Sequence, residues 1–123
     1  MQLHLDRVTG INFISAVAPG EIRVGNRTFR SSLIVSAREI IADWQVSTMD
    51  EIDERSITPI LTMEPEIVLL GTGDSVRFPE RRLLAGVLAQ GIGLEVMDTA
   101  AACRTFNILA AEDRQAVAAL LVG

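Results

Sequence analysis

The residues best suited to chemistry lie in the second half of the chain, in two short stretches that each follow an apolar run. Six residues are candidates for the lining of a ligand site: Gly71, Thr72, Gly73, Thr99, Arg104 and Asn107. Glycine backbone lets a ligand approach closely, and a guanidinium binds carboxylate or phosphate as a planar fork. In this hypothesis Arg104 holds an anion, and the backbone amides of Gly73 and Thr99 assist.

Both stretches also have a purely structural explanation, which is favoured. The stretch from Gly71 to Gly73 suits a tight turn that needs a positive φ. It lacks the third glycine of a dinucleotide fingerprint and the Gly-Lys-Ser/Thr of a Walker loop, and Asp74 would repel a phosphate. Asp98 or Thr99 suits the N-cap of a helix, and an arginine in that helix can pair with a nearby carboxylate.

Other residue types offer no catalytic or metal site. Cys103 and His4 are the single cysteine and histidine, so they make neither an internal disulfide nor a four-ligand zinc site. We expect Cys103 to be a buried free thiol and His4 to lie at the surface or at a sheet edge. Four carboxylates, at positions 50, 51, 53 and 54, read as a solvated helix face. We predict no catalytic residue, no metal and no cofactor.

Composition narrows the class of protein. The chain has 123 residues, of which 49% are hydrophobic, and this predicts one domain spanning residues 1–123 with a single core. The net charge of −5 argues against binding to nucleic acid, and all 11 cations are arginine. No apolar run approaches the roughly 20 residues of a membrane span, and the first residues do not resemble a secretory signal. These features predict a cytoplasmic protein.

The first half of the chain is predicted to be mostly β-structure. Strands are expected at residues 13–18, 22–24, 28–30 and 32–36. The second and third of these flank Gly25-Asn26, a two-residue hairpin turn. Residues 39–46 suit a strand or a short helix, and we favour a strand. Residues 50–61 are expected to form a short helix that Pro59 disturbs or shortens, with Thr48 or Asp50 as its N-cap.

The second half is predicted to be α/β. Strands are expected at residues 66–70 and 94–97, and helices at 79–90 and from 99 to about 110. Two strands joined by one helix form a βαβ unit, so they should be parallel and close together, with their carboxyl ends at one sheet edge. Ligands of open α/β sheets bind at such edges. On the second helix Ala100, Arg104 and Asn107 should share one face. Residues 114–122 suit either a helix or a buried strand.

Several of these pieces occur together in a known order and spacing. They are Pro65-Glu66-Ile67-Val68-Leu69-Leu70-Gly71-Thr72-Gly73, then Gly91-Ile92-Gly93-Leu94-Glu95-Val96-Met97-Asp98-Thr99, then Ala102-Cys103-Arg104-Thr105-Phe106-Asn107-Ile108-Leu109 and Glu112. With them, nearly the whole chain resembles a family of small bacterial and archaeal domains of unknown function, whose mitochondrial member is complex I assembly factor 3. Phe106 departs from the tyrosine that family members usually carry there.

The resemblance implies a fold and a kind of function. The implied fold is α/β with three layers, a central mixed β-sheet flanked by helices with an additional N-terminal β-layer. In that fold residues 114–122 form a strand antiparallel to the others and inserted between them. The implied function is non-catalytic binding or assembly with a protein partner. The alternative is a small-molecule or anion binder, with or without catalysis, that uses a crevice at the strand carboxyl ends. The oligomeric state is left open.

Overall fold

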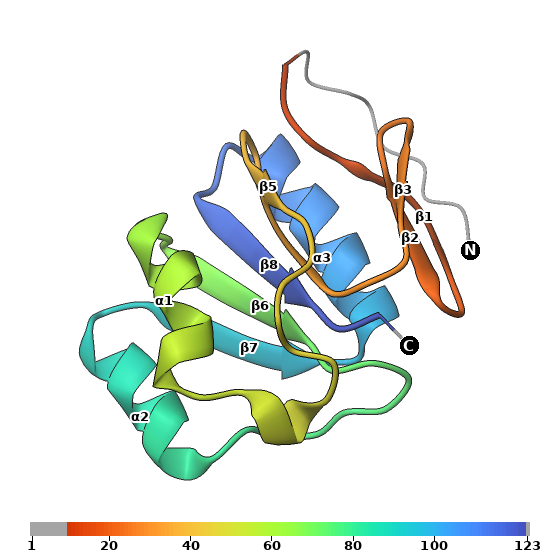
Figure 1. The fold of residues 1–123 in the computed structure, drawn as a ribbon. Helices are drawn as coiled ribbons and strands as arrows, with labels where there is room; N and C mark the ends of the chain where they lie inside the picture. The colour runs from red at the N-terminus through yellow and green to blue at the C-terminus, as the bar shows by residue number, and fades with distance from the viewer. Residues whose placement is uncertain (1–9, 123) are drawn as a thin grey trace.

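The computed structural model describes residues 10–122, and Figure 1 shows their arrangement. The strands are β1 (Ile14–Ala18), β2 (Glu21–Val24), β3 (Arg27–Phe29), β4 (Leu33–Ser36), β5 (Ile40–Ile41), β6 (Ile67–Gly71), β7 (Gly93–Met97) and β8 (Ala116–Leu120). The helices are the 3-10 turn η1 (Met49–Glu51), α1 (Glu54–Thr62), α2 (Arg81–Ala89) and α3 (Thr99–Ala111). None of the helices in residues 10–122 has the length and apolar character needed to cross a bilayer.

The strands form two separate sheets. β1, β2 and β3 make an antiparallel three-stranded sheet in chain order. The other five strands make a mixed sheet in the order β5-β4-β8-β6-β7. In this sheet β8 is antiparallel to β4 and parallel to β6, which is in turn parallel to β7. The carboxyl ends of β6, β7 and β8 therefore lie at the same sheet edge.

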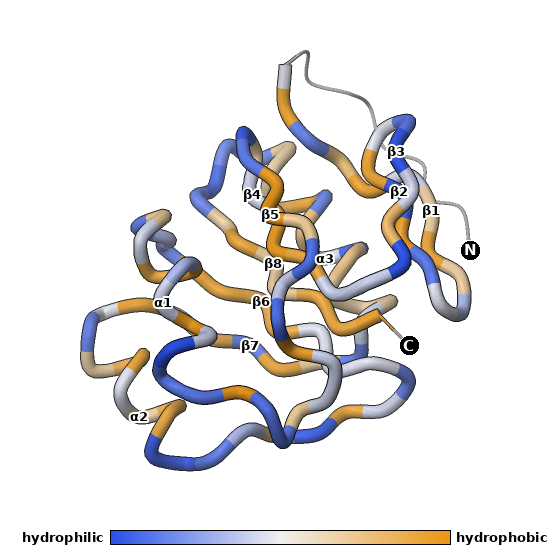
Figure 2. The backbone as a smooth tube through the Cα atoms, viewed as in Figure 1, coloured by the Kyte–Doolittle hydropathy of each residue, from blue (hydrophilic) through white to orange (hydrophobic). Residues whose placement is uncertain are grey.

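Apolar side chains cover both faces of the five-stranded sheet. On one face, residues of β4, β6 and β8 pack with α3 and with the three-stranded sheet. On the other face, the alternate residues of these strands pack under α1 and the segment around Trp44. Leu84 and Val87 of α2 lie over the same face. Figure 2 shows β6 and β8 as mostly hydrophobic, as expected of strands that are covered on both sides. The expected architecture, a central mixed sheet flanked by helices with an additional N-terminal β-layer, is confirmed.

Most of the predicted elements are confirmed with small shifts at their ends. The hairpin turns at Gly25, whose φ is +58°, and α2 is followed by Gly91, whose φ is +78°. β6, α2 and β7 form the expected βαβ unit, with its two strands adjacent and parallel. Asp98 caps α3, because its Oδ1 accepts a hydrogen bond from the Ala101 amide at 2.8 Å. The last segment is a strand, as the resemblance implied.

The direction expected for that last strand is wrong in part. β8 lies between β4 and β6 as implied, but it is antiparallel only to β4. The reason is the connection through α3, which starts at the carboxyl end of β7. A helix that crosses back over the sheet returns the chain to the amino edge, so the following strand is parallel to β6 and β7.

Two other expectations need correction. Residues 39–46 contain only the two-residue strand β5, after which Asp43 takes a positive φ of 55° that ends the extended run. Residues 50–61 form η1 and α1 rather than one helix, because Asp53 caps α1 through a bond from the Ser56 amide at 2.8 Å. Pro59 lies inside α1 and does not end it, since the helix continues to Thr62.

Candidate functional site

The carboxyl end of β6 is the point at which the chain connections diverge. The connection from β6 runs through α2 on one face of the sheet, and the connection from β7 runs through α3 on the opposite face (Figure 1). Such a switch point is where open α/β sheets form ligand crevices. Gly71, Thr72 and Gly73 follow β6 there, and Thr99 begins α3 beside them.

Hydrogen bonds within the protein occupy the polar groups at the carboxyl end of β6. The Gly73 amide donates to the Thr99 hydroxyl at 2.8 Å, and the Thr99 amide donates to the Gly73 carbonyl at 2.9 Å. The Thr99 hydroxyl in turn donates to the Leu121 carbonyl at 2.7 Å. Both amides that the anion hypothesis needs are therefore already bonded to protein acceptors. We call the group formed by Gly73, Thr99 and Leu121 the edge pin, because it ties the ends of β6 and β8 to the start of α3.

Thr72 is used in the same way. Its amide donates to the Met97 carbonyl at 2.9 Å. Its hydroxyl donates to the Ser75 carbonyl at 2.6 Å and accepts from the Arg77 amide at 3.1 Å. Thr72 is 6% exposed, so its polar atoms shape the loop after β6 and do not face a ligand.

The glycines of the motif meet two different structural needs. At Gly71 an added Cβ would lie 3.0 Å from the Thr99 Cα and 3.0 Å from a methyl group of Leu120, so α3 and β8 approach too closely for a side chain. Gly73 has open space around it but a φ of +95°, a conformation that side chains disfavour. Close packing and a positive φ account for both glycines without a ligand.

A hollow of about 440 Å³ lies beside the edge pin. The turn between β1 and β2 forms one wall, and residues that include Gly73, Thr99 and Leu121 form the other. Both loops of the hypothesis therefore touch a concave space. The charged residues that line it are Glu21, Asp74 and Asp98, all acidic. They would repel the anion that the sequence suggested.

Arg104 and Asn107 lie apart from this hollow. They do not share one environment, because Arg104 is exposed and Asn107 is 3% exposed. Residues three apart on a helix point in directions that differ by about 60°. The boundary between the buried and the exposed face of α3 therefore falls between Arg104 and Asn107. The Asn107 side chain donates to the Ile14 carbonyl and accepts from the Ile14 amide, both at 2.8 Å. Both of its polar atoms thus join α3 to β1.

The remaining chemically active residue types are placed as structural groups. Cys103 is a free thiol with no exposed surface, and its burial raises its pKa to about 12. Phe106 is also fully buried, at a position where a tyrosine hydroxyl would need a partner. Within residues 10–122 no three His, Cys, Asp or Glu residues gather as a metal site. His4 lies outside the described residues.

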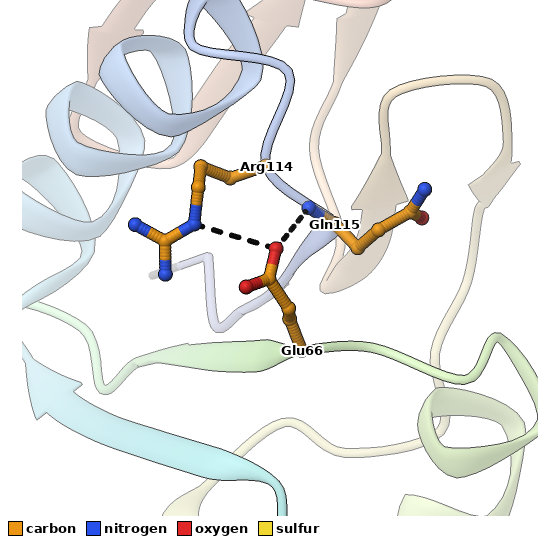
Figure 3. Close-up of polar contacts among 3 residues, drawn as sticks. All are labelled: Glu66, Arg114 and Gln115. Carbon is orange, nitrogen blue, oxygen red and sulfur yellow. Dashed lines mark hydrogen bonds and ion pairs between the residues drawn. The ribbon is translucent and has the colours of Figure 1, made fainter.

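At the opposite edge of the sheet, Glu66 joins the starts of β6 and β8 (Figure 3). One of its carboxylate oxygens accepts from the Gln115 amide at 3.0 Å and from Arg114 Nε at 3.3 Å. The hydrogen bond from the Gln115 amide, and after it the bond from Arg114, lower the pKa of the Glu66 carboxyl below its ordinary value of 4.5. This is a structural contact on the surface.

A second surface was not anticipated from the sequence. The loop after β6 carries Val76, which is 49% exposed, and Phe78, which is 70% exposed. Arg77 lies between them, and Arg81 and Arg82 follow at the start of α2. We call residues 76–82 the 76–82 surface. The available signal was two large apolar residues in a loop, outside any helical or strand period.

The fold and its closed edge define a mixed α/β protein in which α3 and the N-terminal sheet cover one face of a five-stranded sheet. The chain belongs to the family described as a protein of unknown function (DUF498/DUF598), which matches residues 14–121. Phe106 and the edge pin lie within this range, so the family match covers the whole candidate site.

Three relatives show how the chain compares with known proteins. NADH dehydrogenase [ubiquinone] 1 alpha subcomplex assembly factor 3 of Bos taurus is 36% identical over 99 residues, 79% of this chain and 53% of that protein. The chain thus spans about half the length of that relative. A 13 kDa major membrane protein of Francisella tularensis is 25% identical over 93% of this chain and 94% of that protein. A crystal structure from Bordetella parapertussis, 33% identical, has a TM-score of 0.87 over 95% of this chain and all of that one.

Proposed function

We propose that this protein is a non-catalytic binding protein that assists the assembly of a larger protein complex. The observation that carries this proposal is the 36% identity to assembly factor 3 of Bos taurus over 79% of the chain. The closed edge supports it, because the amides of Gly73 and Thr99 are bonded inside the protein. The exposure of Val76 and Phe78, two residues apart on the loop after β6, supports it as well, because apolar surface left open to solvent can mark an interaction site.

Deletion of the gene tests the proposal. In cells of the source organism, we expect the deletion strain to accumulate incomplete forms of a multi-subunit complex, seen by native electrophoresis and by mass spectrometry of the bands. The NADH-oxidising respiratory enzyme is the first complex to examine, given the relative's name. Protein carrying Cys103→Ala should restore assembly, because a binding protein does not need this thiol and alanine adds no buried polar group. An unchanged set of complexes in the deletion strain would refute the proposal.

A small-molecule binder is the second candidate function, and the hollow beside the edge pin favours it. The acidic lining suits a ligand that is neutral or positively charged. A thermal-shift screen against cationic and neutral metabolites tests this candidate, since a ligand at 100 times its dissociation constant stabilises the protein by about 2.7 kcal/mol. Ala100→Leu, which places a larger side chain at the wall of the hollow, should abolish a shift that arises there.

The cytoplasm is where we propose that the protein works. The single unpaired cysteine is in keeping with a reducing compartment. Because one relative is named as a membrane protein, cell fractionation with an antibody against the chain is the direct test. Recovery of most of the protein in the membrane pellet after a high-salt wash would refute a cytoplasmic location.

A further inference from the structure

We propose that the 76–82 surface is the docking site for a protein partner, and that this partner offers an apolar recess for the Phe78 ring with carboxylates that meet Arg81 and Arg82. The inference rests on the proposed binding function. It adds where the partner docks and which chemistry the partner carries at that place.

The apolar part of the surface is Phe78 with Val76. At 70% exposure the Phe78 ring is in contact with water over most of its surface, and Val76 on the same loop is half exposed. Exposed aromatic rings of this kind become anchors in interfaces, where a pocket of the partner removes them from water. A hydrogen bond fixes the conformation of the loop, because the Thr72 hydroxyl accepts from the Arg77 amide. The ring is therefore presented from a structured loop.

The charged part is Arg81 and Arg82 in the first turn of α2. The amino end of a helix carries a partial positive charge, so cations there are unfavourable. Glu80, the N-cap residue, makes no capping hydrogen bond with its side chain. Within residues 10–122 no ion pair reaches either arginine. A carboxylate of a partner would offset the charge of both arginines and of the helix end together.

The charges around the surface favour a protein over a lipid bilayer as the occupant. Glu80 is exposed next to Arg81, Asp74 is exposed earlier on the same loop, and Asp50 lies 3.6 Å from Arg77. A bilayer of anionic lipid presents negative charge in all directions and would repel these carboxylates while it attracts the arginines. A protein can place its carboxylates opposite Arg81 and Arg82 alone. The mixture of charges around an aromatic ring is also typical of the polar rim of protein interfaces.

Site-specific photocrosslinking tests the docking site. Benzoylphenylalanine replaces Phe78 in the full chain, expressed in cells of the source organism. The matched control carries it in place of Ile108, which is 53% exposed on α3. We expect one protein adduct from position 78 and none of that mass from position 108. The double substitution Arg81→Glu and Arg82→Glu should lower the yield of the adduct at least tenfold while the thermal melting curve stays cooperative.

The identity of the adduct provides the decisive step. Once mass spectrometry identifies the crosslinked peptide, reversal of a carboxylate near it to arginine in the partner should restore the adduct with the Arg81→Glu, Arg82→Glu chain. An adduct whose yield is unchanged by the reversal of the two arginines would overturn the inferred chemistry. Cosedimentation of the wild-type chain with vesicles of phosphatidylglycerol and phosphatidylcholine, lost in Phe78→Ser, would replace the protein partner with a membrane and overturn the proposal.

The outcomes separate this inference from the proposed function. If position 78 gives no adduct while the deletion strain accumulates incomplete complexes, the docking site is wrong and the binding function stands. If the deletion strain assembles all complexes normally and position 78 gives no adduct, both are refuted.

Discussion

Asn107 is the residue for which the structure predicts a large loss of stability with a clear cause. It lies on α3, and both polar atoms of its side chain bond the backbone of Ile14, 93 residues earlier, at 2.8 Å. Ile14 has no exposed surface. Its partner in the sheet is Val24 of β2, and within residues 10–122 no strand pairs with β1 along its other edge. The amide of Asn107 thus takes the place of a neighbouring strand for one residue of β1.

The size of the effect follows from the groups left behind. Asn107→Ala leaves the amide and the carbonyl of Ile14 without partners in a buried place, and each such group costs about 1–3 kcal/mol. We expect the free energy of unfolding to fall by about 3 kcal/mol, toward the lower end of the sum of the two costs, because water can enter the space that the side chain leaves. Asn107→Asp should lose at least as much at neutral pH, since a carboxylate still accepts from the Ile14 amide but has no proton for the Ile14 carbonyl and places a charge in a buried site.

Urea denaturation followed by far-UV circular dichroism measures this loss. With a slope of about 1.5–2 kcal/mol per molar urea, a loss of 3 kcal/mol moves the midpoint down by about 1.5–2 M. Ile108→Ala is the control, because Ile108 is the next residue of α3 and is 53% exposed; it should change stability by no more than about 0.5 kcal/mol. Equal midpoints for Asn107→Ala and Ile108→Ala would refute the assignment of Asn107 to the structure.

Three further predictions concern other parts of the fold. Gly71→Ala should lower the free energy of unfolding by about 1–3 kcal/mol, because its Cβ would lie 3.0 Å from the α3 backbone. Gly86→Ala has open space for the Cβ and should raise the free energy of unfolding by up to about 1 kcal/mol. Thermal melts of the two variants compare them. Burial raises the pKa of the Cys103 thiol to about 12, so Cys103 should react with a disulfide reagent only on unfolding. The stability that this raised pKa provides is fully present below about pH 8.5, the pKa of an exposed thiol. It should be lost as the pH rises toward 12. The contacts that lower the pKa of the Glu66 carboxyl stabilise the fold at pH values above its ordinary value of 4.5, and this stability is lost as the pH falls through the lowered pKa. Carbon-13 NMR titration should show a midpoint below 4.5 that rises in Arg114→Ala.

The elements that the sequence predicted well are those with strong local signals. The hairpin at Gly25-Asn26 and the βαβ unit of β6, α2 and β7 combine short apolar runs with glycine at the turns. These signals depend on nearest neighbours in the chain, so they can be read without knowledge of the partner strands. The direction of β8 depends instead on the path of α3 over the sheet, which no local pattern of residues 114–122 contains.

Local capping residues account for the division of residues 50–61. The acidic group there was expected to be one helix face, but Asp53 and Glu51 act as caps. Asp53 accepts from the Ser56 amide, and Glu51 accepts from the amides of Ser47 and Thr48 at 2.7 and 3.0 Å. Two caps so close together require two separate turns. Acidic residues at a helix start and on a solvated face look alike in a sequence, so the division could not be predicted from composition alone.

The candidate ligand site shows why such motifs are ambiguous in a sequence. Glycines and threonines at the end of a strand suit a ligand loop and a closed pin equally well, because both need free backbone conformations and short polar side chains. What distinguishes them is whether the amides are already bonded. For Gly73 the acceptor is Thr99, 26 residues later, and for Thr99 the next acceptor is Leu121. The bonds of the pin therefore depend on the tertiary fold.

The exposure of Phe78 is hidden from the sequence for the same physical reason. An aromatic residue in a loop before a helix suits a hydrophobic contact with that helix as well as an exposed anchor, and only the packing of α2 decides between them. α2 turns Leu84 and Val87 toward the sheet, while Phe78 remains 70% exposed. If the ring served only to stabilise the fold, Phe78→Ser would lower the free energy of unfolding by well over 1 kcal/mol. We expect it to be nearly neutral for stability and strongly harmful to assembly, and this separation is the mark of a binding residue.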